Sequence, residues 1–116
     1  KIVSKSLREC CKVMGILPFA HESTASPTVT VLNVPKETDL KIRNMLEQKY
    51  DIMISKGLGY LFGQVVRIGH MGTSASYGHM SQTLMALGNC LLDLGISDKE
   101  TVKEGTHVGL NILSKL

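Results

Sequence analysis

Apolar residues recur every three to four positions in four stretches of the chain, which is the spacing of one face of an α-helix. The pattern predicts helices over residues 1–14, 38–50, 76–94 and 97–116. Gly15 and Gly95 follow two of these stretches and are typical helix stops. In the last stretch Gly105 and Gly109 are four residues apart, so they lie on one face and favour close contact with another helix.

Polar residues at the starts of these stretches are suited to accept the free N–H groups of a first helical turn. Thr38 or Asp39 is expected to cap the second helix, and Ser76 the third. Ser97 and Glu100 form the pattern of a capping box at the start of the last helix.

Three shorter stretches are typical of β-strands. Residues 28–34 are rich in β-branched side chains and end at Pro35. Residues 51–55 form a second short strand, and residues 65–68 a third, in which apolar side chains surround Arg67. The predicted fold is α+β: a small, mainly antiparallel sheet of about three strands, covered by helices on one face.

Composition narrows the classes of function. The 116 residues suit a single domain, and their net charge of +3 is mild, with scattered lysines and no Trp. This combination does not favour a nucleic-acid partner. No apolar run approaches the ~20 residues of a membrane span. The chain begins inside a periodic stretch at Lys1, so we expect it to be the end of a longer protein.

The side chains that commonly bind metals do not form a recognisable site. Cys10, Cys11 and Cys90 are expected to be free thiols in a reducing cytosol, since their spacing matches no metal site. The four histidines show no metal-binding pattern either, and no nucleophile signature is present. Methionines at helical spacing are interpreted as core side chains; examples are Met45, Met80 and Met85.

Arg67 is the main candidate for a binding residue. An arginine in a half-buried strand requires a partner, and its planar guanidinium matches a carboxylate or a phosphate. The alternative is an arginine on an edge strand, paired with a surface acid. His70 follows in a turn flanked by glycines and either helps to shape an anion site or has a structural or solvent-facing role. The glycine-rich residues 57–63 lack the spacing of a phosphate-binding loop and favour a flexible connection between strands.

Two runs of sequence carry a resemblance to a known family. Residues 51–59 (DIMISKGLG) and 63–72 (GQVVRIGHMG) resemble class V pyridoxal-phosphate aminotransferases, especially the alanine–glyoxylate and serine–pyruvate branch. Residues 26–30 and Val34 with Pro35 also resemble that branch. The resemblance covers about residues 1–95, and the final helix over 97–116 extends past it. Cysteine desulfurases share the fold type but carry a loop cysteine, which residues 56–63 lack.

The resemblance implies that residues 1–116 are the C-terminal small domain of a longer, homodimeric enzyme. The absent large domain of that enzyme would hold pyridoxal phosphate and its Schiff-base lysine. Arg67 would bind the α-carboxylate of the substrate, and Gly57, Gly59 and His70 would shape the site. The implied reaction moves an amino group between alanine or serine and glyoxylate or pyruvate, and the fragment alone would be inactive.

Two alternatives remain open from the residues. The chain could be a non-catalytic α+β module that binds a small carboxylate or a protein partner. A cytoplasmic location is expected, but Ser114, Lys115 and Leu116 match a peroxisomal address if this end is the natural one.

Overall fold

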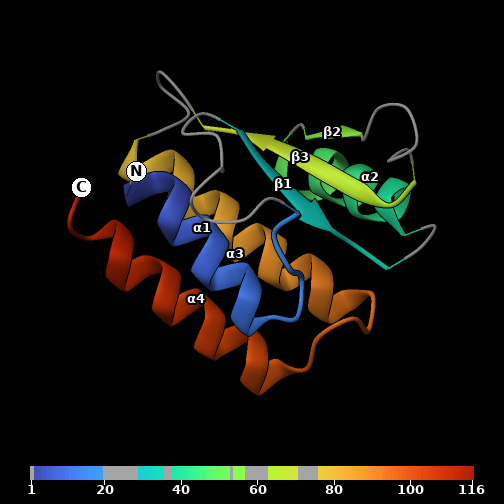
Figure 1. The fold of residues 1–116 in the computed structure, drawn as a ribbon. Coiled ribbons are helices and arrows are strands. Elements are labelled where there is room, and N and C mark those ends of the chain that lie inside the picture. Colours follow the sequence, from blue (N-terminus) through green and yellow to red (C-terminus); the bar gives the residue numbers. More distant parts are fainter. Residues whose placement is uncertain (1, 20–28, 36–37, 53, 57–62, 71–75) are drawn as a thin grey trace.

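The structure is a computed structural model that describes residues 2–19, 29–35, 38–52, 54–56, 63–70 and 76–116. These residues form four helices and three strands (Figure 1). In chain order they are α1 (Ile2–Val13), β1 (Val29–Asn33), α2 (Asp39–Tyr50), β2 (Ser55–Lys56), β3 (Val65–Gly69), α3 (Tyr77–Asp93) and α4 (Lys99–Leu113). The predicted α+β class and the order of elements are confirmed.

The three strands form an antiparallel sheet in the order β1-β3-β2. β3 is therefore the central strand, hydrogen-bonded on both sides. The outer edge of β1 is also paired, because the chain after α1 returns along it. There the N–H of Phe19 donates to the carbonyl of Val31 (2.8 Å), and the N–H of Asn33 donates to that of Leu17 (2.8 Å).

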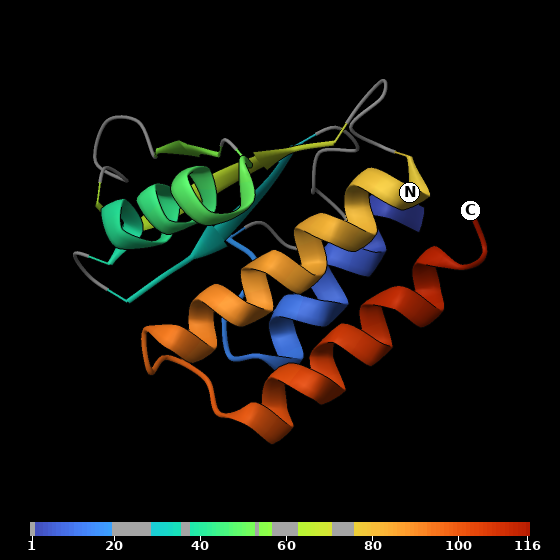
Figure 2. The same cartoon turned by 180° about the vertical axis from the view of Figure 1, so that it is seen from behind.

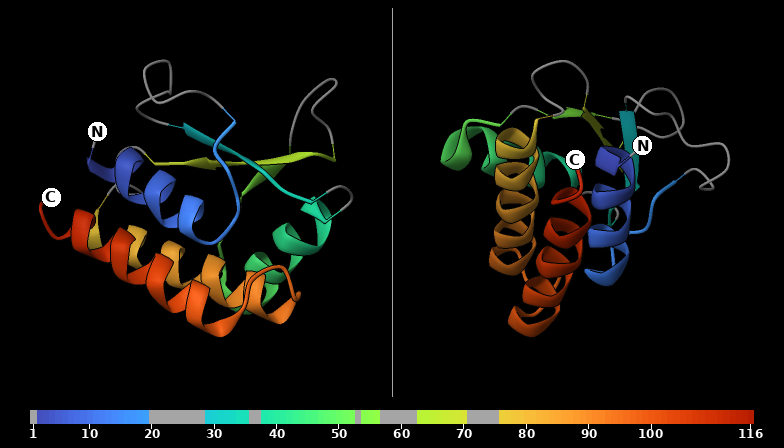
Figure 3. Two further views of the ribbon diagram at one scale, coloured as in Figure 1. Left: turned by 60° about the horizontal axis from the view of Figure 1, so that its bottom comes forward. Right: turned by 90° about the vertical axis from the view of Figure 1, so that its left-hand side faces the viewer.

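All four helices lie on one face of the sheet, as the sequence predicts (Figures 2 and 3). α4 packs against α1 and α3 on the side away from the sheet, so the helices form two layers (Figure 3). The core between sheet and helices consists of fully buried side chains, among them Leu7, Leu32, Val66, Leu84 and Leu91. Burial of this apolar surface is the main force that holds the sheet on the helices.

Glycines allow α4 to approach α1 closely, as the sequence predicts. A Cβ atom built on Gly105 would lie 2.9 Å from the backbone oxygen of Cys10. One built on Gly109 would lie 2.9 Å from Cys10 Cβ and 2.9 Å from Leu84 Cδ1. All three distances are too short for a real Cβ contact, so these two positions require glycine.

Helix α1 ends at the predicted glycine. Gly15 has a φ of +86°, and the N–H of Ile16 donates to the carbonyl of Cys11 (2.9 Å). This is the hydrogen bond of a left-handed helix stop, a conformation that glycine adopts without steric cost. Gly95, with a φ of +74°, follows α3 in the same conformation.

The prediction of a strand over residues 51–55 is wrong at its start. Asp51 ends α2 in a left-handed conformation with a φ of 55°, and the N–H of Ile52 donates to the carbonyl of Leu46 (3.0 Å). Asp51 and Ile52, which the sequence predicts to begin the strand, instead form the turn that ends α2. β2 is therefore limited to Ser55 and Lys56.

The predicted caps are confirmed only for α3, where Ser76 Oγ accepts from the N–H of His79 (3.2 Å). In α4 the cap is Asp98, whose Oδ1 accepts from the N–H of Thr101 (2.8 Å). The side chain of Ser97 instead donates to the carbonyl of Met14. At α2, Thr38 occupies the cap position but makes no side-chain cap bond.

The prediction that the methionines of α3 are core side chains is only partly confirmed. Met80 is fully buried, whereas Met85 is 44% exposed. Met85 is therefore not a core side chain.

Candidate functional site

Arg67 lies in the middle of the central strand. Its neighbours Val66 and Ile68 are buried in the core against the helices. Since successive side chains of a strand point to opposite faces, Arg67 points to the face that the helices leave uncovered. The side chain is half-buried. The alternative of an edge-strand arginine is wrong, because β3 has a strand on either side.

Val31 and Ser55 flank Arg67 on this helix-free face. In the antiparallel register Arg67 is opposite Val31 of β1 and opposite Ser55 of β2. Side chains that oppose each other in this way share one face and lie close together. The side chain of Arg67 therefore leaves the sheet between the apolar side chain of Val31 and the hydroxyl of Ser55. Sequence reasoning missed Ser55, because strand register cannot be read from local periodicity.

His70 lies on the other face. Its Nε2 is 2.7 Å from Thr30 Oγ1, and the two residues are only 2% and 3% exposed. Thr30 pairs with Ile68 in the register and shares its helix-covered face. A buried hydrogen bond of this kind joins β1 to the end of β3 and is typical of a structural role. Gly57 and Gly59 lie outside the described residues.

The lysines whose side chains the structure describes do not resemble a cofactor lysine. A lysine that forms a Schiff base is normally desolvated in a protein pocket. Every lysine whose side chain is described is exposed to solvent: Lys5, Lys12, Lys41, Lys49, Lys99, Lys103 and Lys115. The part of the chain that the structure describes thus does not fit a pyridoxal-phosphate site by itself.

The three cysteines are buried free thiols. Burial raises the pKa of Cys10 to about 12 and that of Cys90 to about 11, and it also raises the pKa of Cys11. Such thiols are poor nucleophiles and poor metal ligands. Within the described ranges, no group of three or more His, Cys, Asp or Glu residues could hold a metal ion. Among the same residues, no helix combines the length and apolarity that crossing a membrane requires.

Comparison with curated proteins finds aminotransferases. The chain is 35% identical over 114 residues to an uncharacterised aminotransferase of Methanocaldococcus jannaschii. It is 31% identical over 114 residues to a pyridoxamine–pyruvate transaminase of Mesorhizobium japonicum. Both alignments cover 97% of this chain, so they include most of α4. An alanine–glyoxylate aminotransferase of Felis catus is 38% identical over 66 residues, which cover 56% of this chain and 16% of the cat protein. No protein-family model matches the chain.

Solved structures give the same result. The crystal structure of pyridoxamine–pyruvate aminotransferase from Mesorhizobium loti matches 98% of this chain with a TM-score of 0.85 and 29% identity. That match covers 29% of the solved chain, and the first two curated relatives are covered to 29% and 28% of their length. The resemblance seen in the sequence is thereby confirmed: this chain is a homologue of one segment of the class V aminotransferases.

Proposed function

We propose that this chain is the C-terminal small domain of a pyridoxal-phosphate-dependent aminotransferase, and that Arg67 binds the α-carboxylate of its substrates. The observation that carries the proposal is the position of Arg67 on the central strand, half-buried on the face free of helices. The homology to aminotransferases over nearly the whole chain supports it.

The chemistry of the side chain suits this role. A guanidinium forms two parallel hydrogen bonds to a carboxylate, which fix both its position and its orientation. The amino acid and the keto acid of a transamination both carry this carboxylate, so one clamp serves both half-reactions. The hydroxyl of Ser55, opposite Arg67 in the register, is suited to give a further hydrogen bond on the same face.

In this proposal the large domain of the complete enzyme, and not this chain, binds the cofactor. When bound there, pyridoxal phosphate supplies the electron sink for the reaction, while this domain positions the substrate. We propose alanine or serine as amino donor and glyoxylate or pyruvate as acceptor. The names of two relatives, which contain pyruvate and glyoxylate, support small keto acids as substrates.

The test is steady-state kinetics of the complete enzyme with Arg67→Ala and Arg67→Lys. Loss of a charged hydrogen-bonding pair of about 1.5–3 kcal/mol should raise the KM for both substrates about 10- to 150-fold. Arg67→Lys should recover only part of the loss, since lysine keeps the charge but not the paired geometry. Arg43→Lys is the control, because Arg43 lies on α2 with Asp39 as its partner (3.3 Å). An unchanged KM in Arg67→Ala removes this residue from the site.

A second measurement separates the proposal from a non-catalytic binding module. Isothermal calorimetry of the isolated chain should show weak or no binding of amino and keto acids, because half of the site is on the large domain. Tight binding by the isolated chain would favour the binding module. Transamination by these residues alone would contradict the proposal.

Assembly and location are parts of the same proposal. We expect the complete enzyme to be a homodimer, which sedimentation of the purified protein measures. A cytoplasmic location is proposed, with the peroxisome as the alternative if Leu116 is the natural end. Imaging of a fusion that leaves this end uncovered, with and without residues 114–116, distinguishes the two.

A further inference from the structure

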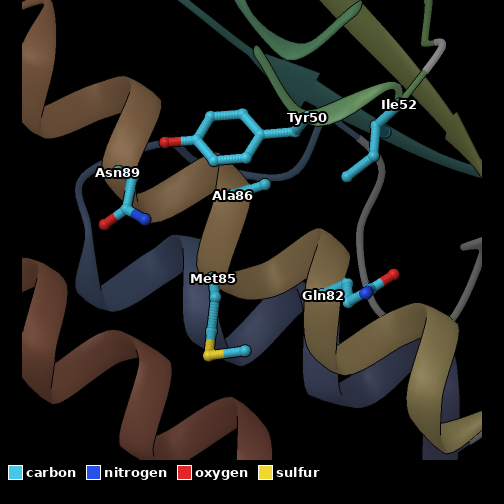
Figure 4. Close-up of a pocket in the computed structure, with 6 residues that line it drawn as sticks. All are labelled: Tyr50, Ile52, Gln82, Met85, Ala86 and Asn89. Atoms are coloured by element: carbon cyan, nitrogen blue, oxygen red, sulfur yellow. The ribbon is translucent and has the colours of Figure 1, made fainter.

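The outward face of α3 contains two adjoining hollows. The first, of about 300 Å³, lies between α2 and α3 (Figure 4). It is lined by Tyr50, Ile52, Gln82, Met85, Ala86 and Asn89. The second, of about 480 Å³, lies between α3 and α4 and shares Met85 and Asn89 with the first. The two hollows share Met85 and Asn89 on the exposed side of α3, and together they are here called the α3 groove.

The floor of the groove is apolar. Met85 is 44% exposed and extends from α3 on the side away from Tyr50 (Figure 4). Leu92, two turns further along α3, is 36% exposed, and Val102 and Leu110 of α4 complete the second hollow. Flexible methionine side chains adapt to different partner surfaces, which suits them to a docking site. Contiguous exposed apolar surface is typical of interaction sites rather than of free protein surface.

The rim of the groove is basic. Lys99, Lys103 and His107 follow each other at intervals of four residues, so they form one row along α4. No Asp or Glu is among the residues that line either hollow. Asp93 at the end of α3 is already paired with Lys49 (3.1 Å). The groove therefore has an apolar floor beside a row of basic side chains, and the exposed Glu100 and Glu104 of α4 do not line it.

We propose that the α3 groove binds an acidic amphipathic helix of a partner protein. The apolar face of such a helix, with anchors at the spacing i, i+3, i+4 and i+7, fills the two hollows. Its glutamates lie beside Lys99 and Lys103. The length of α4 along the groove, about 16 Å from Lys99 to Leu110, matches about three turns of a helix. The opposite charge of rim and partner steers the association and suppresses basic partners.

The test uses two designed helical peptides with the purified protein. Both carry leucine on one face; one carries glutamate on the other face, and its counterpart carries lysine. Fluorescence anisotropy should show binding of the acidic peptide and about tenfold weaker binding of the basic one. In the double variant Lys99→Glu/Lys103→Glu this preference should reverse. Met85→Gln should weaken the acidic peptide about tenfold by removing an apolar anchor.

Two matched controls locate the binding. Lys115→Glu reverses the charge of one lysine beyond the end of α4, and Leu40→Gln makes a similar polar change on the exposed face of α2. Neither should alter the affinity. Circular dichroism confirms that all variants fold. Absence of binding, equal binding of both peptides, or an equal loss of affinity in Lys115→Glu and in Lys99→Glu/Lys103→Glu would each overturn the proposal.

Discussion

Thr30 and His70, 40 positions apart in the sequence, are joined by a buried 2.7 Å hydrogen bond. The bond lies on the helix-covered face of the sheet and connects β1 to the residue that follows β3. Arg67, three residues before His70, points to the opposite face. The hydrogen bond between Thr30 and His70 thus ties β3 to β1 on the face opposite to the one that carries Arg67.

This relationship predicts the effect of Thr30→Val. Valine keeps the shape of threonine but removes the hydroxyl, so His70 loses this buried partner. Unfolding by urea should show a loss of about 1–3 kcal/mol, while Thr30→Ser, which keeps the hydroxyl, should lose less. A loss in Thr30→Ser as large as that in Thr30→Val would contradict the prediction, because it would show that the methyl group contributes as much stability as the hydrogen bond.

Close packing of α4 on α1 predicts that Gly105→Ala destabilises the fold. The new Cβ would lie 2.9 Å from the backbone oxygen of Cys10, which cannot move unless α1 shifts. Overpacking of about 1–3 kcal/mol should exceed the helix-propensity gain of about 1 kcal/mol. Gly78→Ala is the control: a Cβ there has open space within 4 Å, so thermal melting should be unchanged or slightly higher. A melting temperature of Gly105→Ala at or above wild type would contradict the packing argument.

The buried cysteines predict slow reaction with thiol reagents. With the pKa of Cys10 raised to about 12 and that of Cys90 to about 11, almost no thiolate is present at about pH 8. Native protein should therefore react slowly with a chromogenic disulfide, and protein in denaturant should react rapidly at all three positions. Rapid labelling of the native protein would show that these thiols are accessible.

The same raised pKa values set a trend at alkaline pH. A thiol with a higher pKa in the folded state contributes stability that is complete below the unfolded pKa, near 9.0. Above that pH the unfolded chain ionises first, so stability should fall as the pH rises toward about 12. Denaturant unfolding of wild type and Cys10→Ala across this range measures the difference.

Asp98 gives a trend of the opposite sign at acid pH. Hydrogen bonds from Thr101 hold the pKa of its carboxylate below the ordinary value of 3.8. A lowered pKa means that the stabilising contribution is present above this value and is lost as the pH falls through the folded pKa. Wild type should therefore be more stable than Asp98→Ala at neutral pH, and the difference should shrink below about pH 4. A Ser97→Ala variant tests the buried bond to Met14 instead and should not share this pH dependence.

Local sequence determined most of the secondary structure and its class. Helical periodicity placed the four helices, and Gly15 and Gly95 marked the ends of α1 and α3, because glycine adopts positive φ without cost. The apolar residues around Arg67 predicted its strand. These features depend on a residue and its near neighbours in the chain, which is why a single sequence is enough to predict them.

Only the tertiary structure decided the properties that depend on distant partners. The central position of β3, the pairing of Arg67 with Val31 and Ser55, and the bond between Thr30 and His70 all require the strand register. Register is set by contacts across long stretches of chain, and local periodicity does not contain it.

Competition between partners explains the remaining differences. Ser97 was expected to cap α4, but its hydroxyl bonds to the carbonyl of Met14 across the fold, and Asp98 takes the cap. Met85 has the helical spacing of a core residue, but its side chain is exposed and lines the two hollows beside α3. Burial is decided by what packs against a residue, so the groove beside Met85 could be found only after the helices were placed together.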